Sequence, residues 1–140
     1  MRTALICFFT LILFSCKKNK EPKQDPIPNN TSLKWAKNYG GSDYDFATSI
    51  VQISSGDYVF TGNTRSNDGD VAGTRWGFDA WLTKMDVNGN KVWSQTYGDH
   101  NDDYGTAVAN TPDGGFLIVG YTFVNFQNYA WAIKTDANGN

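Results

Sequence analysis

The sequence predicts an all-β fold of two four-stranded antiparallel propeller-type blades, which form part of a larger β-propeller. Three observations predict it. The sequence repeats itself from residue 33 onward, the repeated part shows no sustained helical period, and its apolar runs are short and separated by turn residues. A repeat of this length is typical of propellers and arrays, in which one supersecondary unit recurs.

The repeat is defined by a motif and by two constant spacings. Trp-x-x-x-Tyr-Gly occurs at residues 35–40 and again 58 residues later at 93–98. The same spacing relates Asp45 to Asp103, Thr48 to Thr106, Gly56 to Gly114, Gly62 to Gly120, and Thr64 to Thr122. After a loop that is eight residues shorter in the second copy, a spacing of 50 relates residues 80–90 to 130–140. We therefore predict β repeat 1 over residues 33–90 and β repeat 2 over residues 91–140.

Each copy divides into four apolar runs that we predict as strands. In the first copy they are residues 33–39, 47–53, 58–64 and 79–85, and in the second 92–97, 107–111, 116–122 and 129–135. Ser55-Gly56 and residues 113–115 are short enough for tight hairpins. Asn88-Gly89 and Asn138-Gly139 favour a type I′ turn, because this dipeptide tolerates positive φ at both central positions.

Alternation along the strands predicts which faces are buried. Trp81, Thr83 and Met85 share one side of their run, and Leu82 lies on the other. Residues 116–119 are apolar on both sides, as in a strand that is covered on both faces. Such a strand in a repeated four-strand unit is typical of a blade between neighbouring blades. A β-sandwich is less favoured because it needs no repeat of this length, and an open β-solenoid is the third alternative.

The repeated motif also resembles a known family. The pattern Trp-x-x-x-Tyr-Gly, Asp-Gly-Gly-aromatic and Trp-Leu-x-Lys-x-Asp-x-Asn-Gly-Asn is similar to a repeat of large exported proteins of Gram-negative bacteria. Residues 66–73 resemble the loop that precedes the tryptophan strand in that family, and the second copy lacks this loop. The resemblance implies propeller-like blades in a lipoprotein or a secreted surface protein. It transfers no catalytic residue.

The start of the chain predicts export and a lipid anchor. Residues 4–14 are an apolar run of eleven residues, too short for a spanning helix and suited to a signal peptide. The sequence Leu-Phe-Ser-Cys at residues 13–16 resembles a lipoprotein box. We predict a signal peptide over residues 1–15 and lipid attachment at Cys16, and an ordinary secretory signal is the alternative. Lys17 resembles the sorting signal for the outer membrane.

Residues 16–32 are predicted to form a flexible tether between the lipid and the repeats. After Cys16 they hold three of the four prolines and one aliphatic residue, too little to offset the entropy of ordering. The tether carries a net charge of +2 and the repeat region −5, a polarity that suits a protein attached to an anionic membrane. The acidic repeats argue against nucleic acid as a partner, because its binding rests on neutralising phosphates.

No catalytic constellation is visible, so we predict no enzyme activity, no cofactor and no metal site. His100 is the only histidine and lies in a polar turn. Residues 86–90 place oxygen ligands at alternate positions, as calcium loops do. Lys91 and the residues after it occupy the approach to the acidic ligand that such a loop needs, so a turn is favoured. Recurring aspartates are interpreted as caps of turn amides, and a carboxylate pair for glycoside hydrolysis is the alternative.

Candidate ligand-binding residues are the aromatic side chains that differ between the copies. Trp35, Trp81, Trp93 and Trp131 recur and are predicted to serve packing. Trp76 has no counterpart, and Phe123 and Phe126 occupy the equivalent variable loop. Loops on a repeat scaffold often carry the binding surface. We therefore predict a carbohydrate or protein ligand at these three residues, and the alternative is that they fold back over the blade.

The sequence thus predicts a membrane-anchored lipoprotein of the bacterial cell envelope that acts as a binding or scaffolding module. The alternative is the front part of a propeller enzyme of the quinoprotein or galactose-oxidase type, or a glycan-active protein. Propellers close with about four to eight blades, and the chain supplies two repeats. We expect it to be the front portion of a longer propeller, and assembly of several chains into one ring is the alternative.

Overall fold

The computed structural model describes residues 32–71, 73–74 and 77–140, and Leu33–Asn140 form one compact unit. The all-β prediction is confirmed, since the described residues form strands and no helix. The strands are β1 (Asp45–Gln52), β2 (Tyr58–Thr64), β3 (Asp79–Met85), β4 (Lys91–Tyr97), β5 (Asp102–Asn110), β6 (Phe116–Val124) and β7 (Gln127–Thr135). Cys16 and Trp76 lie outside the described residues.

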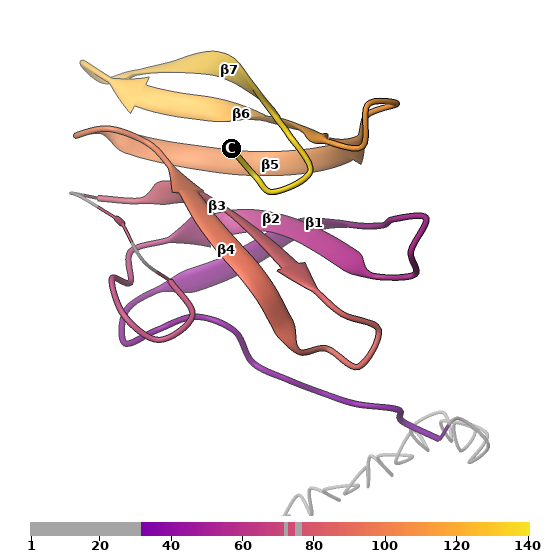
Figure 1. Ribbon diagram of the computed structural model, residues 1–140. Helices are drawn as coiled ribbons and strands as arrows, with labels where there is room; N and C mark the ends of the chain where they lie inside the picture. The colour runs from indigo at the N-terminus through magenta and orange to yellow at the C-terminus, as the bar shows by residue number, and fades with distance from the viewer. Residues whose placement is uncertain (1–31, 72, 75–76) are drawn as a thin grey trace, which may run out of the picture. The chain divides into compact units, whose positions relative to one another are not determined.

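The strands form two antiparallel sheets (Figure 1). The first sheet has the order β1-β2-β3-β4, and the second has the order β5-β6-β7. β2 and β3 have the predicted bounds, whereas β1 and β5 begin two and five residues earlier than predicted. The strand predicted over residues 33–39 is not formed. β4, which opens the second repeat, pairs with β3 of the first, so sheet and sequence repeat are offset by one strand.

Turn residues connect the strands of the hairpins as predicted, but the predicted type of the Asn-Gly turns is wrong. Asn88-Gly89 connects β3 to β4 as predicted, but it is not a type I′ turn because only Gly89 has positive φ, at 74°. The Asp86 carboxylate accepts hydrogen bonds at 2.8 Å from the backbone amides of Asn88 and Asn90. A side chain that satisfies these amides favours a longer loop with one left-handed glycine. Asp136 repeats the arrangement with Asn138 and Asn140.

A β-bulge recurs in the first strand of each sheet and requires a glycine opposite it. The register shifts between Ala47 and Ser49 in β1, and between Gly105 and Ala107 in β5. A Cβ atom on Gly62 would lie 1.7 Å from the backbone oxygen of Phe46. A Cβ on Gly120 would lie equally close, at 1.7 Å, to the oxygen of Tyr104. The repeated glycine therefore allows close approach of the bulged backbone.

The main apolar cluster lies between the two sheets. Val59 and Leu82 of the first sheet contact Val108, Phe116 and Ile118 of the second, and all five are at most 7% exposed. Burial of this many large side chains is the main stabilising contribution in a domain whose described residues contain no cysteine. The two sheets therefore pack face to face as neighbouring layers.

A second cluster covers the other face of the first sheet. Phe60, Trp81 and Met85 are buried there, and Trp35 and Tyr39 pack against them. This confirms that Trp81 and Met85 share a side opposite to Leu82. Figure 1 shows the stretch before β1 running along the side of the first sheet that faces away from the second. The segment predicted as a strand is thus a cover for this face.

Candidate functional site

The strand ends near Asp45, Thr64 and Asp79 carry a continuous row of aromatic rings. The row, named the aromatic row here, consists of Tyr44, Phe46, Phe78, Tyr104 and Tyr121. Successive ring centroids lie 6.3, 6.0, 5.5 and 4.8 Å apart, within the range of favourable ring contacts. The row begins beside β1 and ends on β6, so it crosses from the first sheet to the second.

The middle of the aromatic row is fixed by the backbone. The amide of Phe78 donates to the carboxylate of Asp102 at 2.9 Å, and the oxygen of Phe78 accepts from the amide of Asp103 at 2.6 Å. The guanidinium of Arg65 lies 5.5 Å from the centre of the Phe78 ring, a cation–π distance. Both sheets therefore hold Phe78 in place, which reduces the entropy lost when a ligand contacts this region.

The repeated aspartates support the loops beneath this surface. The Asp45 carboxylate accepts from the Gly41 amide at 2.8 Å, and Asp103 accepts from the Asp99 amide at 2.9 Å. These acceptors and donors are each 58 residues apart. Asp103 is 2% exposed. The interpretation of these aspartates as caps of turn amides is confirmed.

The β6–β7 hairpin places one aromatic residue in an unusual conformation. Val124 pairs with Gln127, so Asn125 and Phe126 are the two central residues of the turn. Their φ angles are 50° and 63°, the only positive values for non-glycine residues in the described part of the chain. A type I′ turn needs such angles and prefers glycine at the second position. Phe126 therefore has a strained conformation that is rare for a bulky side chain.

Phe126 is also the most accessible large apolar residue described, at 94% exposed. Its ring contacts that of Phe123 edge to face at 6.4 Å. Phe123 is 39% exposed and lies on the same face of β6 as Tyr121, because side chains alternate along a strand. The predicted pair is thus brought together next to the end of the aromatic row. Strained and exposed side chains of this kind concentrate at functional positions.

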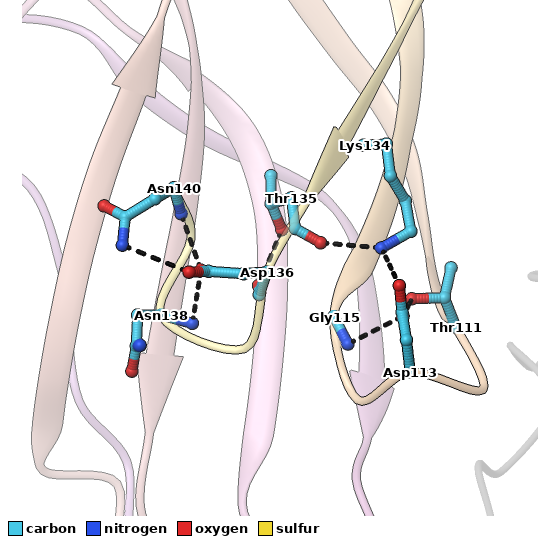
Figure 2. A network of polar contacts seen from close by, with 8 residues as sticks. All are labelled: Thr111, Asp113, Gly115, Lys134, Thr135, Asp136, Asn138 and Asn140. Carbon is cyan, nitrogen blue, oxygen red and sulfur yellow. Dashed lines mark hydrogen bonds and ion pairs between the residues drawn. The ribbon is translucent and has the colours of Figure 1, made fainter.

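The opposite ends of the strands hold carboxylates that are already hydrogen-bonded (Figure 2). Figure 2 shows Asp113 between Thr111, Gly115 and Lys134, and Asp136 beside Asn138 and Asn140. The Lys134 ammonium lies 2.8 Å from Asp113 and holds the pKa of that carboxyl well below its usual range. Hydrogen bonds from backbone amides, of which the one from Asn140 has the largest effect, likewise lower the pKa of Asp136. These groups stabilise turns, in agreement with the sequence interpretation.

His100 is exposed in a bend, as expected. Across residues 32–71, 73–74 and 77–140, no cluster of three or more His, Cys, Asp or Glu residues could hold a metal ion. The same residues contain no helix with the length and apolar character needed to cross a bilayer.

Sequence reasoning missed the aromatic row, although one signal was present. An aromatic residue follows the repeated aspartate in both copies, as Phe46 and Tyr104. Their connection through Phe78 depends on the packing of the two sheets, which the repeat does not specify. No protein-family model matches the chain, and a search of curated proteins finds no matching sequence.

Proposed function

We propose that this chain is a lipid-anchored lipoprotein of the bacterial outer membrane whose propeller-type domain is a binding or scaffolding module. The binding surface consists of Phe126, Phe123 and the adjoining aromatic row, and the ligand is a carbohydrate or a protein. The observation that carries the proposal is Phe126, which is 94% exposed with φ of 63°. Folding alone would favour glycine at this position, so retaining an exposed phenylalanine points to contact with a ligand.

The order of the strands supports this position for the site, if the two sheets are arranged as in a propeller. β1 and β5 are the first strands of their sheets, and β5 contacts the first sheet. In a propeller such strands surround a central channel, and the aromatic row begins beside β1 and includes Tyr104 of β5. A ligand at this end would reach both sheets at once.

Binding is tested on the full chain with a glycan array and with a screen of envelope proteins. The expected result is a ligand whose binding falls at least tenfold in Phe126→Ala. Val87→Ala is the matched control, because Val87 is 51% exposed in a turn at the opposite strand ends and its loss should leave binding unchanged. Equal binding by wild type and Phe126→Ala would show that this surface is not the binding site. A ligand from only one of the two screens decides between carbohydrate and protein.

Anchoring is tested separately by metabolic labelling with a fatty acid. Wild type should incorporate the label and fractionate with the outer membrane, and Cys16→Ser should lose both properties. Cys7→Ser is the matched control, because Cys7 lies in the predicted signal peptide and its replacement should leave labelling intact. An unlabelled wild-type protein would exclude the lipid anchor without affecting the binding proposal.

A further inference from the structure

We propose that the aromatic row binds an arginine side chain from a basic segment of a partner protein. This ligand class rests on the proposed function, because it decides between carbohydrate and protein for the same surface. The site is the part of the row that belongs to the first sheet, namely the rings of Tyr44, Phe46 and Phe78, together with the charged groups around them. It depends neither on the lipid anchor nor on the second sheet's outer face.

The three rings form an accessible aromatic surface. Tyr44 and Phe46 are 62% and 49% exposed. Their ring planes differ by 5° with centroids 6.3 Å apart, and the Phe78 ring follows at 6.0 Å from Phe46. Aromatic and arginine side chains carry much of the binding energy at protein interfaces. Exposed rings in this arrangement therefore suit a protein ligand that supplies the arginine.

A guanidinium already lies on one of these rings. Arg65 follows β2, and its guanidinium carbon lies 5.5 Å from the centre of the Phe78 ring. The negative face of an aromatic ring attracts a cation, and a planar guanidinium can also stack on the ring. Arg65 is itself exposed, so burial does not force it onto Phe78. The contact identifies the group that the row attracts, and the same chemistry is available at Phe46 and Tyr44.

Three carboxylates lie beside these rings. Asp43 directly precedes the first ring in the sequence. Asp68 accepts a hydrogen bond from the amide of Ser42 at 2.7 Å, which holds it next to the same segment. Asp102 accepts from the amide of Phe78 at 2.9 Å. All three aspartates are at least partly exposed, so a cation bound to the rings would lie close to negative charge.

The described lysines do not neutralise these carboxylates. Lys134 pairs with Asp113 at 2.8 Å in a turn at the opposite strand ends (Figure 2). Lys84 pairs with Asp57 at 3.3 Å in another turn at those ends. The row therefore has an excess of negative charge beside it, which is complementary to a cationic partner and repels an anionic one. The remaining lysines lie before β1 or begin β4, where one of them pairs with Asp70 at 3.0 Å: Lys34, Lys37 and Lys91.

Hydrogen bonds hold this surface in place before any ligand binds. The amide of Asp43 donates to the hydroxyl of Ser66 at 3.0 Å, and the amide of Tyr44 donates to the Asp43 carboxylate at 2.8 Å. The amide of Arg65 donates to the backbone oxygen of Tyr44 at 2.9 Å. A surface that is already ordered loses less conformational entropy when a ligand binds.

The rings and the charges together favour arginine over other ligands. A neutral sugar could stack on a ring, but it would leave the carboxylates without a counter-charge. A lysine ammonium would supply the charge, but it is compact and strongly hydrated, and it lacks the plane that stacks on a ring. Arginine uses both features, because its guanidinium can donate to a carboxylate while its plane lies on an aromatic face.

The probe is a fluorescent hexa-arginine peptide, titrated with the full chain carrying Cys16→Ser so that no lipid is attached. Fluorescence anisotropy should show binding at least about threefold tighter than that of hexa-lysine, which has the same charge. A hexa-glutamate peptide should not bind. Equal binding of hexa-arginine and hexa-lysine would mean that net charge alone acts, and it would overturn the inference. Absence of hexa-arginine binding would do the same.

Substitutions at the row separate the ring from the charge. Phe46→Leu keeps an apolar side chain without a π face and should weaken hexa-arginine binding about three- to tenfold, whereas Phe46→Tyr should bind like wild type. Asp43→Asn should also weaken binding, because its amide oxygen can still accept from Tyr44 but carries no charge. Asp57→Asn removes the same charge at the opposite strand ends and should have a smaller effect. If Phe46→Leu binds like wild type, or if the two Asn variants lose equal affinity, the row is not the site.

Arg65→Gln should strengthen binding, a result that a merely structural role would not produce. The variant uncovers the Phe78 ring and removes a repelling charge, so the affinity for hexa-arginine should rise about three- to tenfold. Lys84→Gln is the matched control, because it removes an equal charge at the opposite strand ends and should change the affinity less. Unchanged or weaker binding by Arg65→Gln would overturn the inference.

The outcomes separate this inference from the function proposed above. If the glycan array yields a neutral sugar whose binding depends on Phe126 and hexa-arginine does not bind, the binding module stands and the arginine site is wrong. If hexa-arginine binds the row and Phe126→Ala changes no interaction in either screen, the arginine site stands and the hairpin tip is not part of it.

Discussion

Tyr97 donates its hydroxyl hydrogen to the backbone oxygen of Gly139 over 2.6 Å, and this bond joins β4 of the first sheet to the turn after β7 in the second. Tyr39 makes the equivalent bond to Gly89 at 2.7 Å. A tryptophan ring lies against each glycine, and a Cβ atom there would approach Trp93 and Trp35 at 3.0 and 2.9 Å. One repeated motif thus links each Asn-Gly turn to the segment that begins the same repeat, which is β4 in the second repeat and an irregular segment in the first.

The Tyr97 bond predicts an alkaline transition in stability. Burial, with a smaller effect of the Asp136 charge, raises the pKa of Tyr97 from 10.0 to about 12. Its contribution is fully present below pH 10, where the unfolded tyrosine is also protonated, and is lost as the pH rises towards 12. The free energy of unfolding should therefore fall over this interval. Urea denaturation curves of wild type and Tyr97→Phe should show a shallower decline in the variant, and parallel declines would contradict the assignment.

Truncation of Trp81 should destabilise the fold strongly, whereas truncation of Phe126 should leave its stability almost unchanged. Trp81 is 1% exposed in the cluster with Phe60, so Trp81→Ala should cost about 3–5 kcal/mol of unfolding free energy. Phe126→Ala should change it by less than about 0.5 kcal/mol, as is usual for surface positions. Thermal or chemical denaturation measures both. Similar losses in the two variants would mean that the hairpin tip is part of the core.

Phe126→Gly should make the protein more stable. A left-handed conformation costs a non-glycine residue roughly 1–2 kcal/mol, and glycine gives back part of this gain through its greater freedom in the unfolded chain. The net increase in unfolding free energy should be about 0.5–1 kcal/mol. The variant also creates an Asn-Gly turn at residues 125–126, the preferred type I′ sequence. Lower stability in this variant would contradict the strain inferred for Phe126.

Gly62→Ala and Gly120→Ala should each destabilise the fold strongly. The added methyl group would lie 1.7 Å from a backbone oxygen in both cases, and a bulged strand cannot move away as a flexible side chain does. We expect a cost of about 3 kcal/mol or more, the upper end for overpacking. Gly114→Ala is the control, because nothing lies within 4 Å of its added methyl group. Its cost should be about 1 kcal/mol, from the positive φ alone. Of the three glycines only Gly114 has positive φ, so losses at Gly62 and Gly120 no larger than the loss at Gly114 would contradict the close approach of the bulged backbone.

The individual strands could be predicted from the sequence, but their grouping could not. Apolar alternation between turn residues places β2 and β3 with the bounds that the structure shows. The same pattern predicts a strand over residues 33–39, where none forms. The alternation of apolar residues indicates which segments can form a strand. Whether a segment does form one depends also on a neighbouring strand edge with which it can pair. β4 has that edge in β3, and segment 33–39 has none in the described part of the chain.

The candidate site was predictable only where a residue breaks the repeat. Phe123 and Phe126 stand out because the second copy differs there from the first. The strain at Phe126 could not be foreseen, since the two-residue turn follows from the pairing of Val124 with Gln127. The role of Phe78 could not be predicted from the sequence at all. Its position depends on hydrogen bonds to Asp102 and Asp103, which belong to a different sheet.

The offset between repeat and sheet has a consequence for how such a gene can change in length. Suppose that a duplication inserts a unit whose boundary lies between Asn90 and Lys91. The first strand of this unit would pair with the last strand of the preceding sheet, and its own last strand would offer an edge to the first strand of the next unit. Every junction in the lengthened product would then reproduce the pairing of β3 with β4. Recombination could add or remove units without inventing a new interface. Selection on the number of sheets would then act on whole repeat units, because each new junction already has a compatible strand pairing.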